Sequence, residues 1–472
     1  MSEEKEFKKK LEAVEKSQSG YEIKLLDREV KDLKTLKEII TYYFPDLWFE
    51  TKACLSACLI LSLKNMNGCP SLNLVGNPSG GKTTILSFFY GHDKTYISDD
   101  FTPKAFVSHA TNVKKEELEN IDLLPRIRNK ILITPELAPL FESSKDKLID
   151  TFAMLTRVLD GEGLHRDTGT QGHRGYSGDY KFVWLGATTP IRSRVWNLMG
   201  KLGNRLFFLN MHETNKTEKD YLEMFSGEEY EERVKTCRSA IRDYLNYMFK
   251  WNKPRSMKWA ENPEDKEILK EIIKYSKLLS KLRGSLVSWK SKEEGKDYEY
   301  QFPIIEEPMR AINFLRNLAR GHAIINGRRY LTKDDLVLVK RVCLSSMPHD
   351  RYMFFQLLQK HKGRLTTEII QKELSCSDDT ARRTMRIFEV LGVVTIKDLP
   401  MGEGRPMFYV EINPEFQDLI DTQGVDIVRK TNKTIELGGM SKGHIHPSND
   451  EEKSNTHENT PLHEKVGVTK FK

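Results

Sequence analysis

A glycine-rich segment between an apolar run and a helical pattern is the strongest constraint on this chain. The segment Gly76, Asn77, Pro78, Ser79, Gly80, Gly81, Lys82 and Thr83 matches the phosphate-binding loop GxxxxGK[ST]. An apolar run at 72–75 precedes it, and a helix-forming run from Thr84 follows it. In the order strand, loop, helix, several backbone N–H groups and the start of the helix face one anion. We therefore expect nucleotide phosphates to bind at residues 76–84, rather than a glycine-rich turn with a chance lysine.

The last residues of this loop have distinct expected roles. In the mechanics of the motif, Lys82 reaches the terminal phosphates, and the Thr83 hydroxyl ligates Mg²⁺. The expected cofactors are a nucleoside triphosphate and Mg²⁺.

A second apolar strand, at residues 130–134, ends in Pro135 and Glu136. In a nucleotide hydrolase this position normally carries Asp and then Glu, for Mg²⁺ and for the attacking water. Glu136 can still act as the base. With Pro135 in place of Asp, Mg²⁺ would rest on Thr83, phosphate and waters, with Asp99 or Asp100 as further candidates. Alternatively, Glu136 only caps the helix that begins near residue 137.

Two more strands complete the expected core. The run 180–187 ends in Thr188 and Thr189, whose polar side chains would lie near the terminal phosphate. Arg205 stands at the head of the apolar run 206–209, where it could stabilise phosphate charge in a neighbouring subunit. Strands alternating with helices predict an α/β fold, a parallel sheet covered by helices, and Arg205 implies a homo-oligomer.

These motifs, in this order, resemble the AAA+ ATPases, and in particular the cores of minichromosome maintenance helicases, over residues 45–345. The resemblance implies ATP as the nucleotide, Thr189 as sensor 1 and Arg205 as an arginine finger. It also implies a charged N-terminal arm at 1–45, a nucleotide-binding core at 46–215, and a helical connector and lid at 216–347. Arg310 opens a lid helix and is the candidate sensor 2. An ordinary surface arginine is the alternative there.

Residues 165–176 form a glycine-rich, basic segment that suits a hairpin or an exposed loop. In the related helicases a hairpin at this place grips the nucleic-acid backbone. By that analogy Arg166, His173 and Arg174 are candidate DNA contacts, with a plain surface loop as the alternative.

Residues 348–415 read as three helices and a strand–turn–strand unit, which resembles a winged helix as in origin-recognition initiators. Its third helix would present Arg382, Arg383 and Arg386 to DNA. Winged helices also dock proteins, so that alternative stays open. Residues 416–472 lose apolar density and predict a disordered tail.

Composition fits an intracellular protein without a membrane partner. The net charge of +7 permits DNA as a partner, and the charged N-terminus is unlike a signal peptide, which favours a cytoplasmic location. The sequence thus predicts a DNA-dependent ATPase of helicase, loader or replication-initiator type. The alternatives are an ATP-gated DNA-binding switch with weak or no hydrolysis, which Pro135 supports, and a protein remodeller.

Overall fold

The computed structural model describes residues 29–108, 117–169, 172–212, 217–218, 222, 229–260, 262, 265–290, 298–399 and 407–421. Most of the predicted N-terminal arm, the turn at 401–405 and residues 422–472 lie outside these ranges. The predicted start of the disordered tail at residue 416 is too early. Pro414–Phe416 is a 3-10 turn with a buried Phe416, and α18 (Asp418–Asp421) follows.

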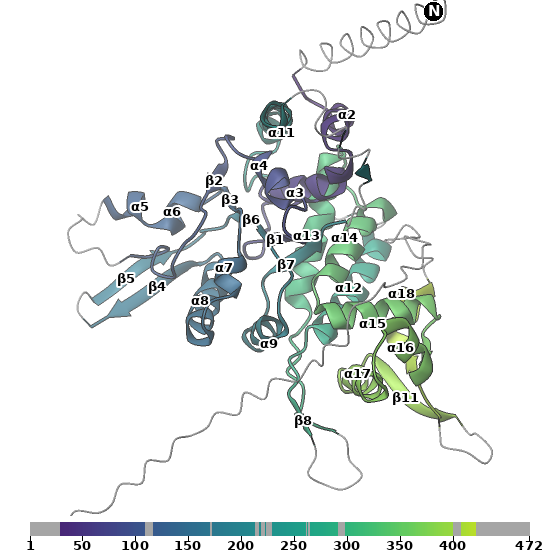
Figure 1. Ribbon diagram of the computed structural model, residues 1–472. Coiled ribbons are helices and arrows are strands. Elements are labelled where there is room, and N and C mark those ends of the chain that lie inside the picture. The colour runs from purple at the N-terminus through teal and green to yellow at the C-terminus, as the bar shows by residue number, and fades with distance from the viewer. Residues whose placement is uncertain are drawn as a thin grey trace, which may run out of the picture. The chain divides into compact units, whose positions relative to one another are not determined.

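A parallel sheet of five strands forms the centre of the molecule, as predicted, in the order β2-β3-β6-β1-β7 (Figure 1). Its strands are β1 (Ser71–Val75), β2 (Thr95–Ile97), β3 (Ile131–Thr134), β6 (Val183–Thr188) and β7 (Phe207–Asn210). The three inner strands β1, β3 and β6 are buried along their whole length, because helices cover both faces of a parallel sheet. This arrangement is compatible with a P-loop ATPase-like fold.

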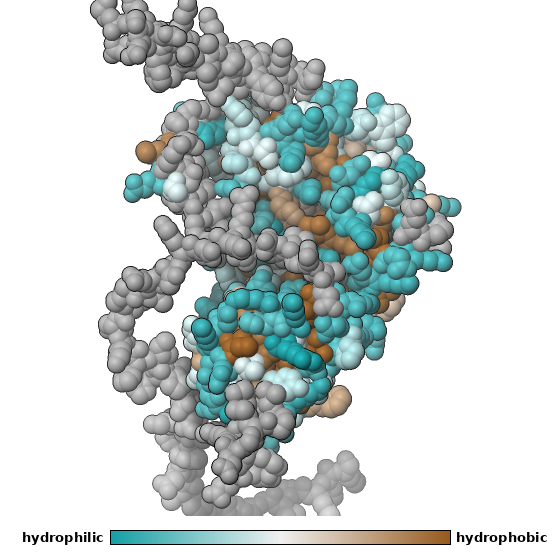
Figure 2. All heavy atoms as spheres, turned by 90° about the vertical axis from the view of Figure 1, so that its right-hand side faces the viewer, coloured by the Kyte–Doolittle hydropathy of each residue, from teal (hydrophilic) through white to brown (hydrophobic). Residues whose placement is uncertain are grey.

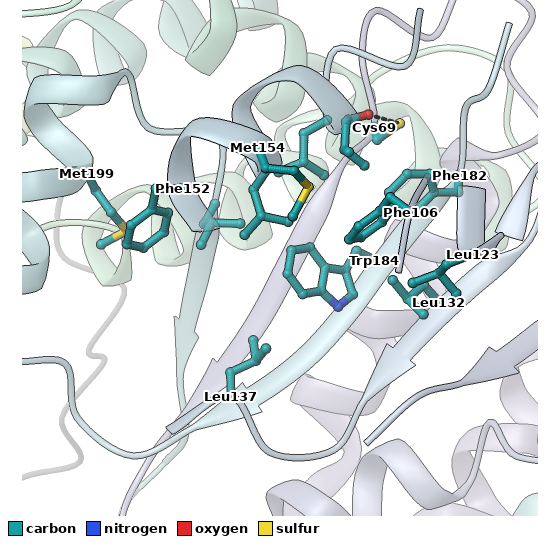
Figure 3. Packing of buried hydrophobic residues seen from close by; sticks show 14 of the residues in the cluster. Cys69, Phe106, Leu123, Leu132, Leu137, Phe152, Met154, Phe182, Trp184 and Met199 are labelled. Atoms are coloured by element: carbon teal, nitrogen blue, oxygen red, sulfur yellow. Dashed lines mark hydrogen bonds between the residues drawn. The ribbon is translucent and has the colours of Figure 1, made fainter. Parts of the chain in front are cut away.

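Large side chains fill the space between the sheet and its helices. Figure 3 shows the Trp184 indole of β6 beside Met154 of α8 and Phe106. The indole N–H donates to the Thr134 hydroxyl on the neighbouring strand, at 3.1 Å, so its polar edge is satisfied inside the core. The helices of this half are α2 (Leu33–Tyr43), α3 (Trp48–Ile60), α4 (Lys82–Ser87), α5 (Leu118–Ile121), α6 (Leu123–Ile127), α7 (Ala138–Phe141), α8 (Lys145–Val158) and α9 (Ser193–Leu202).

The glycine-rich, basic segment at 165–176 lies in a hairpin, one of its two predicted forms. In it β4 (Gly163–Thr168) pairs with β5 (Gly172–Ser177), beside α5 and α6 (Figure 1). Glycine is required at Gly163 and Gly175. A Cβ there would meet the Tyr176 and Leu164 carbonyl oxygens at 2.0 and 2.2 Å.

Four long helices follow the sheet: α11 (Tyr230–Trp251), α12 (Asp265–Leu282), α13 (Met309–Ile325) and α14 (Lys333–Ser345). Between α12 and α13 lies a short antiparallel pair of strands, β8 (Ser288–Lys290) and β9 (Tyr298–Tyr300), within the predicted helical connector and lid. Helix α13 packs closely on α3 because Gly321 has no side chain: a Cβ would lie 2.0 Å from the Ser56 carbonyl oxygen.

The C-terminal described residues form α15 (His349–Lys360), β10 (Arg364–Thr366), α16 (Thr367–Leu374), α17 (Asp378–Val390), β11 (Val394–Leu399) and β12 (Met407–Ile412). Ser377 caps α17, because its side-chain oxygen accepts from the Thr380 N–H. The strands form an antiparallel sheet in the order β10-β12-β11, whose first member had no clear sequence signal. The predicted division of the chain into domains, with this unit as one of them, stays a prediction.

Figure 2 shows a mostly hydrophilic face with hydrophobic patches between the charged side chains. None of the helices in the described ranges is both long and apolar enough to cross a membrane.

Candidate nucleotide site

The loop between β1 and α4 has the backbone of an anion-binding cradle. Ser79 and Gly81 take positive φ angles of 61° and 84°, which turn the chain sharply before the helix. Within the described residues, no protein acceptor serves the backbone N–H groups of Gly81, Lys82, Thr83 and Thr84. A row of free donors at the end of a glycine loop suits phosphate oxygens.

Lys82 is folded back against this loop. Its Nζ donates to the carbonyl oxygens of Gly76 and Asn77 at 2.8 and 2.7 Å, and the residue is buried. Burial lowers the pKa of the Lys82 ammonium, and the nearby Glu136 carboxylate opposes that shift. The two residues predicted for phosphate and water thus lie within electrostatic reach of each other.

Glu136 follows β3, as predicted, and its carboxylate accepts from the Ala138 N–H at 2.9 Å. This is the capping role that sequence reasoning held as the alternative, since Ala138 begins α7. The side chain is exposed, so releasing that bond would leave it free to orient water. The geometry accommodates both roles.

The strand ends meet at the loop. Val75 is in register with Thr188, and the Gly76 N–H donates to the Thr188 carbonyl oxygen at 3.2 Å. Thr189, the predicted sensor 1, follows directly and is half-buried at the same sheet edge. We call this surface, made of residues 76–84, Glu136 and Thr189, the loop edge.

The donor set on the loop edge fits Mg²⁺ only in a hydrated form. Thr83 offers an exposed hydroxyl and Glu136 a carboxylate, while Pro135 offers no ligand. Mg²⁺ commonly keeps several waters and takes one or two protein ligands beside the phosphates, so this sparse set is sufficient.

Arg205 lies at the opposite end of the sheet from the loop, where the strands begin. It precedes Phe207, whose partner on β1 is Leu72, four residues before the loop. At a rise of about 3.3 Å per residue, that offset corresponds to roughly 13 Å or more. Its guanidinium donates to Asp160 at 3.0 and 3.4 Å and is only 10% exposed. Burial lowers the pKa of Arg205, and Asp160 opposes that shift.

Arg310 lies beside Arg205. A Cβ on Gly203 would be 2.9 Å from the Arg310 guanidinium and 3.6 Å from that of Arg205. Glu306 holds the group together: it lies 3.8 Å from Arg310 and accepts from the Asn204 N–H. Arg310, the candidate sensor 2, thus lies with Arg205 near the start of β7, and its role as sensor 2 stays a prediction. We call Arg205, Glu306 and Arg310 the arginine edge.

Sequence reasoning missed the residues that flank the loop. Leu47 packs on Gly81, where a Cβ would lie 3.0 Å from its methyl group. The Tyr230 hydroxyl hydrogen-bonds the Thr84 hydroxyl at 2.6 Å. Beside them is a cleft of about 490 Å³, lined by Thr83, Thr84, Ser87, Tyr230, Glu231, Glu232, Val234, Lys235 and Arg238. No local pattern could have joined α11 to the loop, because Tyr230 stands 146 residues from Thr84.

The predicted DNA contacts on the β4–β5 hairpin have different environments. Arg174 donates to the buried Asp122 carboxylate at 2.9 Å, an ion pair that anchors the hairpin to α6. Arg166, its cross-strand neighbour, is half-buried. His173 is exposed, stacks on His165 and bonds Asp167 at 2.9 Å. Of the three, His173 is the most accessible.

The arginines of α17 are all engaged with neighbours. Arg382 pairs with Asp378 and Arg386 with Glu389, each at 2.6 Å, while Arg383 donates to the Ser288 hydroxyl of β8. Arg383 and Arg386 are nevertheless exposed. Exposed ion pairs of this kind are weak and exchange readily for phosphate partners.

Comparison with known proteins adds little to this geometry. No protein-family model and no curated protein matches the chain. Among solved structures, a candidate ATPase from Cytophaga hutchinsonii is 13% identical, covers 70% of this chain and 89% of its own, and has a TM-score of 0.37. Two apo structures of the C-terminal region of NrS-1 are each 12% identical, cover 82% of this chain and 78% of theirs, and have TM-scores of 0.25 and 0.24. Likenesses at these TM-scores establish no shared activity.

Proposed function

We propose that this chain binds ATP with Mg²⁺ at the loop edge and hydrolyses it. The observation that carries the proposal is the row of free N–H groups from Gly81 to Thr84 beside a buried lysine. The first N–H groups of every helix lack intrahelical partners, and here the turned glycine loop and the buried Lys82 gather around them, which suits an anion. A triphosphate would supply acceptors for these N–H groups and negative charge opposite the Lys82 ammonium.

In this proposal each loop-edge residue has one task. Lys82 exchanges its two carbonyl partners for phosphate oxygens, and Thr83 holds the metal. When bound, Mg²⁺ would neutralise charge on the phosphate oxygens. Glu136 leaves the Ala138 N–H and orients the attacking water, while Thr189 faces the terminal phosphate.

The arginine edge supports the second half of the proposal, an AAA+-type homo-oligomer. Arg205 and Arg310 lie on the sheet edge opposite their own loop. In a head-to-tail assembly, one copy's arginine edge faces the next copy's loop edge, so both guanidiniums can stabilise transition-state charge there.

We propose DNA as the partner on which this assembly acts. Its support is the element order α15-β10-α16-α17-β11-β12, from which we infer a winged helix, and the exposure of Arg383 and Arg386 on α17. His173 and Arg166 would supply contacts from the β4–β5 hairpin. We therefore propose that the chain is of the helicase, loader or initiator type.

An ATP-gated DNA-binding switch with little hydrolysis is the second candidate. It is favoured by Pro135 and by the bond between Glu136 and the Ala138 N–H, which occupies the proposed base.

Steady-state ATPase assays with and without DNA separate these candidates. DNA-stimulated turnover that disappears in Glu136→Gln supports hydrolysis. ATP binding without turnover in the parent chain supports the switch. Absence of any Mg²⁺-dependent ATP binding contradicts both.

A further inference from the structure

The β4–β5 hairpin has two faces of different chemistry. In its antiparallel register His165 lies opposite Gly175, and Asp167 lies opposite His173. Side chains directly across from each other share a face, as do side chains two residues apart on one strand. Four polar residues therefore share one face of the hairpin, and all four are exposed. We call this set the outer face: His165, Asp167, His173 and Ser177.

The side chains of the outer face form a single chain of hydrogen bonds. Ser177 Oγ lies 2.8 Å from His165 Nε2, and His165 Nδ1 lies 3.2 Å from Nε2 of His173. At the other end, His173 Nδ1 lies 2.9 Å from an Asp167 carboxylate oxygen. Gly175 makes room for the meeting of the two rings, because a Cβ there would lie 3.0 Å from His165 Nδ1.

The Asp167 carboxylate fixes where the protons of this chain sit. An ionised carboxylate only accepts, so a neutral His173 must donate from Nδ1 and keep Nε2 as an acceptor. His165 then donates from Nδ1 to His173, and the Ser177 hydroxyl donates to His165 Nε2. In this state every ring nitrogen is used inside the chain.

The two rings have room for one further proton but not for two. A first proton fits on His165 Nε2, because the Ser177 hydroxyl can rotate and accept from it. A second proton would have to go on His173 Nε2, where it would face the His165 Nδ1–H across 3.2 Å. Two positive rings and two donors would then oppose each other, so the second proton requires the rings to separate.

Charged and titratable side chains elsewhere on and against the hairpin include Asp122, Arg157, Asp160, Arg166, Arg174 and Tyr176. Arg174 and Tyr176, on the opposite face, both donate to the Asp122 carboxylate, at 2.9 and 2.7 Å. Asp160 follows α8, which packs against β4, and accepts from Arg205. Within the described residues, neither imidazole has a hydrogen-bond or ion-pair partner outside the chain.

We propose that His165 and His173 act as one proton-binding unit that regulates the contact between the hairpin and DNA. The inference rests on the proposed function, in which the hairpin contacts the nucleic-acid backbone. Without the further proton, the Asp167 carboxylate gives the outer face a negative charge that repels phosphate. Imidazole gains charge just below neutral pH, and one proton on the pair cancels the charge of Asp167. The hairpin therefore binds DNA more tightly as the pH falls.

Fluorescence anisotropy with a labelled DNA oligonucleotide tests the proposal on the full chain. The Kd is measured from about pH 8.5 to about pH 6 at one salt concentration, because phosphate contacts depend on salt. The variants are His165→Asn, His173→Asn and the double variant. His349→Asn is the matched control, since His349 is an exposed histidine outside the hairpin. ATP affinity, measured beside it, should be the same for all of them and shows that the fold is intact.

One proton taken up on binding changes the Kd by at most about 10-fold per pH unit. The parent chain and both single variants should therefore share one slope of log Kd against pH, because a lone histidine still takes up one proton. The double variant should have a shallower slope, by up to one proton, and the control should match the parent chain. A parent-like slope in the double variant overturns the proposal. So do slopes that add, with the parent chain steeper than each single variant, because the two rings would then bind protons independently.

Asp167→Asn gives a second test that leaves both histidines in place. It keeps an acceptor for His173 and removes the negative charge, so DNA affinity should rise a few-fold at the high end of the pH range, where the parent chain binds most weakly. Unchanged affinity there contradicts the proposed regulation. Failure of the parent chain to bind DNA at every pH instead contradicts the proposed partner, and this inference falls with it.

Discussion

The loop edge and the arginine edge lie at the two ends of the strands of the central sheet, and they present different chemical groups. Within the described residues, the loop edge offers backbone donors that no protein acceptor serves, beside the buried Lys82, while the arginine edge offers two guanidiniums held by carboxylates. Under the proposed function, the loop edge would bind the phosphates and the arginine edge would add positive charge for phosphoryl transfer. All strands of a parallel sheet begin at one end of the sheet and finish at the opposite end. A single copy therefore cannot bring its own loop edge and arginine edge together.

The two arginines differ in how exposed they are beside their carboxylate partners. Arg205 sits 10% exposed on Asp160, whereas Arg310 is half-exposed beside Glu306. Arg310 is therefore the easier of the two to redirect toward a neighbour. Arg205 must first exchange one carboxylate for another anion.

Removing Arg205 should have the largest effect on the comparison. Arg205→Ala is expected to lower kcat by about 10³, the scale for an arginine that stabilises phosphoryl-transfer charge. ATP affinity of the isolated copy should not change, because the loop edge is intact. Turnover and equilibrium binding of a fluorescent ATP analogue measure both quantities.

The control is Arg157→Ala, which removes an exposed arginine that also faces Asp160, at 3.5 Å. It should keep parent-like turnover. If Arg205→Ala retains full kcat, the arginine edge has only a structural role.

Removing Lys82 should act on the other edge and on binding. Lys82→Ala is expected to weaken ATP affinity by about 10- to 100-fold, the worth of hydrogen bonds to a charged group. Isothermal titration with Mg²⁺ and ATP measures it, beside Lys64→Ala, an exposed lysine that precedes the start of β1, whereas the loop follows the end of that strand. Equal affinities for the two variants would contradict a phosphate site at the loop.

The packing between α13, the helix that carries Arg310, and α3 can be tested separately. Gly321→Ala forces a methyl group against the Ser56 carbonyl of α3, at 2.0 Å in the present backbone. Overpacking of this kind costs about 1–3 kcal/mol, so a lower Tm in thermal unfolding is expected. Gly327→Ala provides a comparison in open space, although its positive φ of 70° adds some strain. An unchanged Tm for Gly321→Ala would show that α13 is free to move relative to α3.

The smallest effect is expected on α17, which lies outside both edges. Arg386→Ala should reduce DNA affinity only a few-fold and lower the salt dependence of binding by about one released counterion. Fluorescence anisotropy at several salt concentrations tests this, with Arg364→Ala on β10 as the control. ATP binding should be the same in both variants. No change in salt dependence would remove α17 from the proposed DNA surface.

Local patterns sufficed for the elements that depend on neighbours in sequence. The loop after β1, the strand before Glu136, the β4–β5 hairpin and the Ser377 cap all follow from residues close along the chain. The helix that Arg310 opens was predicted for the same reason, since Pro308 precedes a regular apolar spacing.

Long-range partners could not be predicted. Arg205 pairs with Asp160 across 45 residues and Arg174 with Asp122 across 52. Such pairs depend on which elements meet in space. The same holds for Arg310, whose place depends on α13 packing against α3. Strands β8 and β9 have three residues each, which is too short for a periodic signal, so this strand pair could not be predicted.

Mixing two inactive variants shows directly whether the pocket is shared between copies. Lys82→Ala keeps its arginine edge, and Arg205→Ala keeps its loop edge. Each alone should have almost no ATPase activity. In an equal mixture of freely exchanging copies, about a quarter of the head-to-tail contacts join two intact edges, so turnover should rise to roughly that share of the parent rate. A mixture no more active than its two components, although sedimentation shows that they co-assemble, would mean that the two edges do not form one pocket.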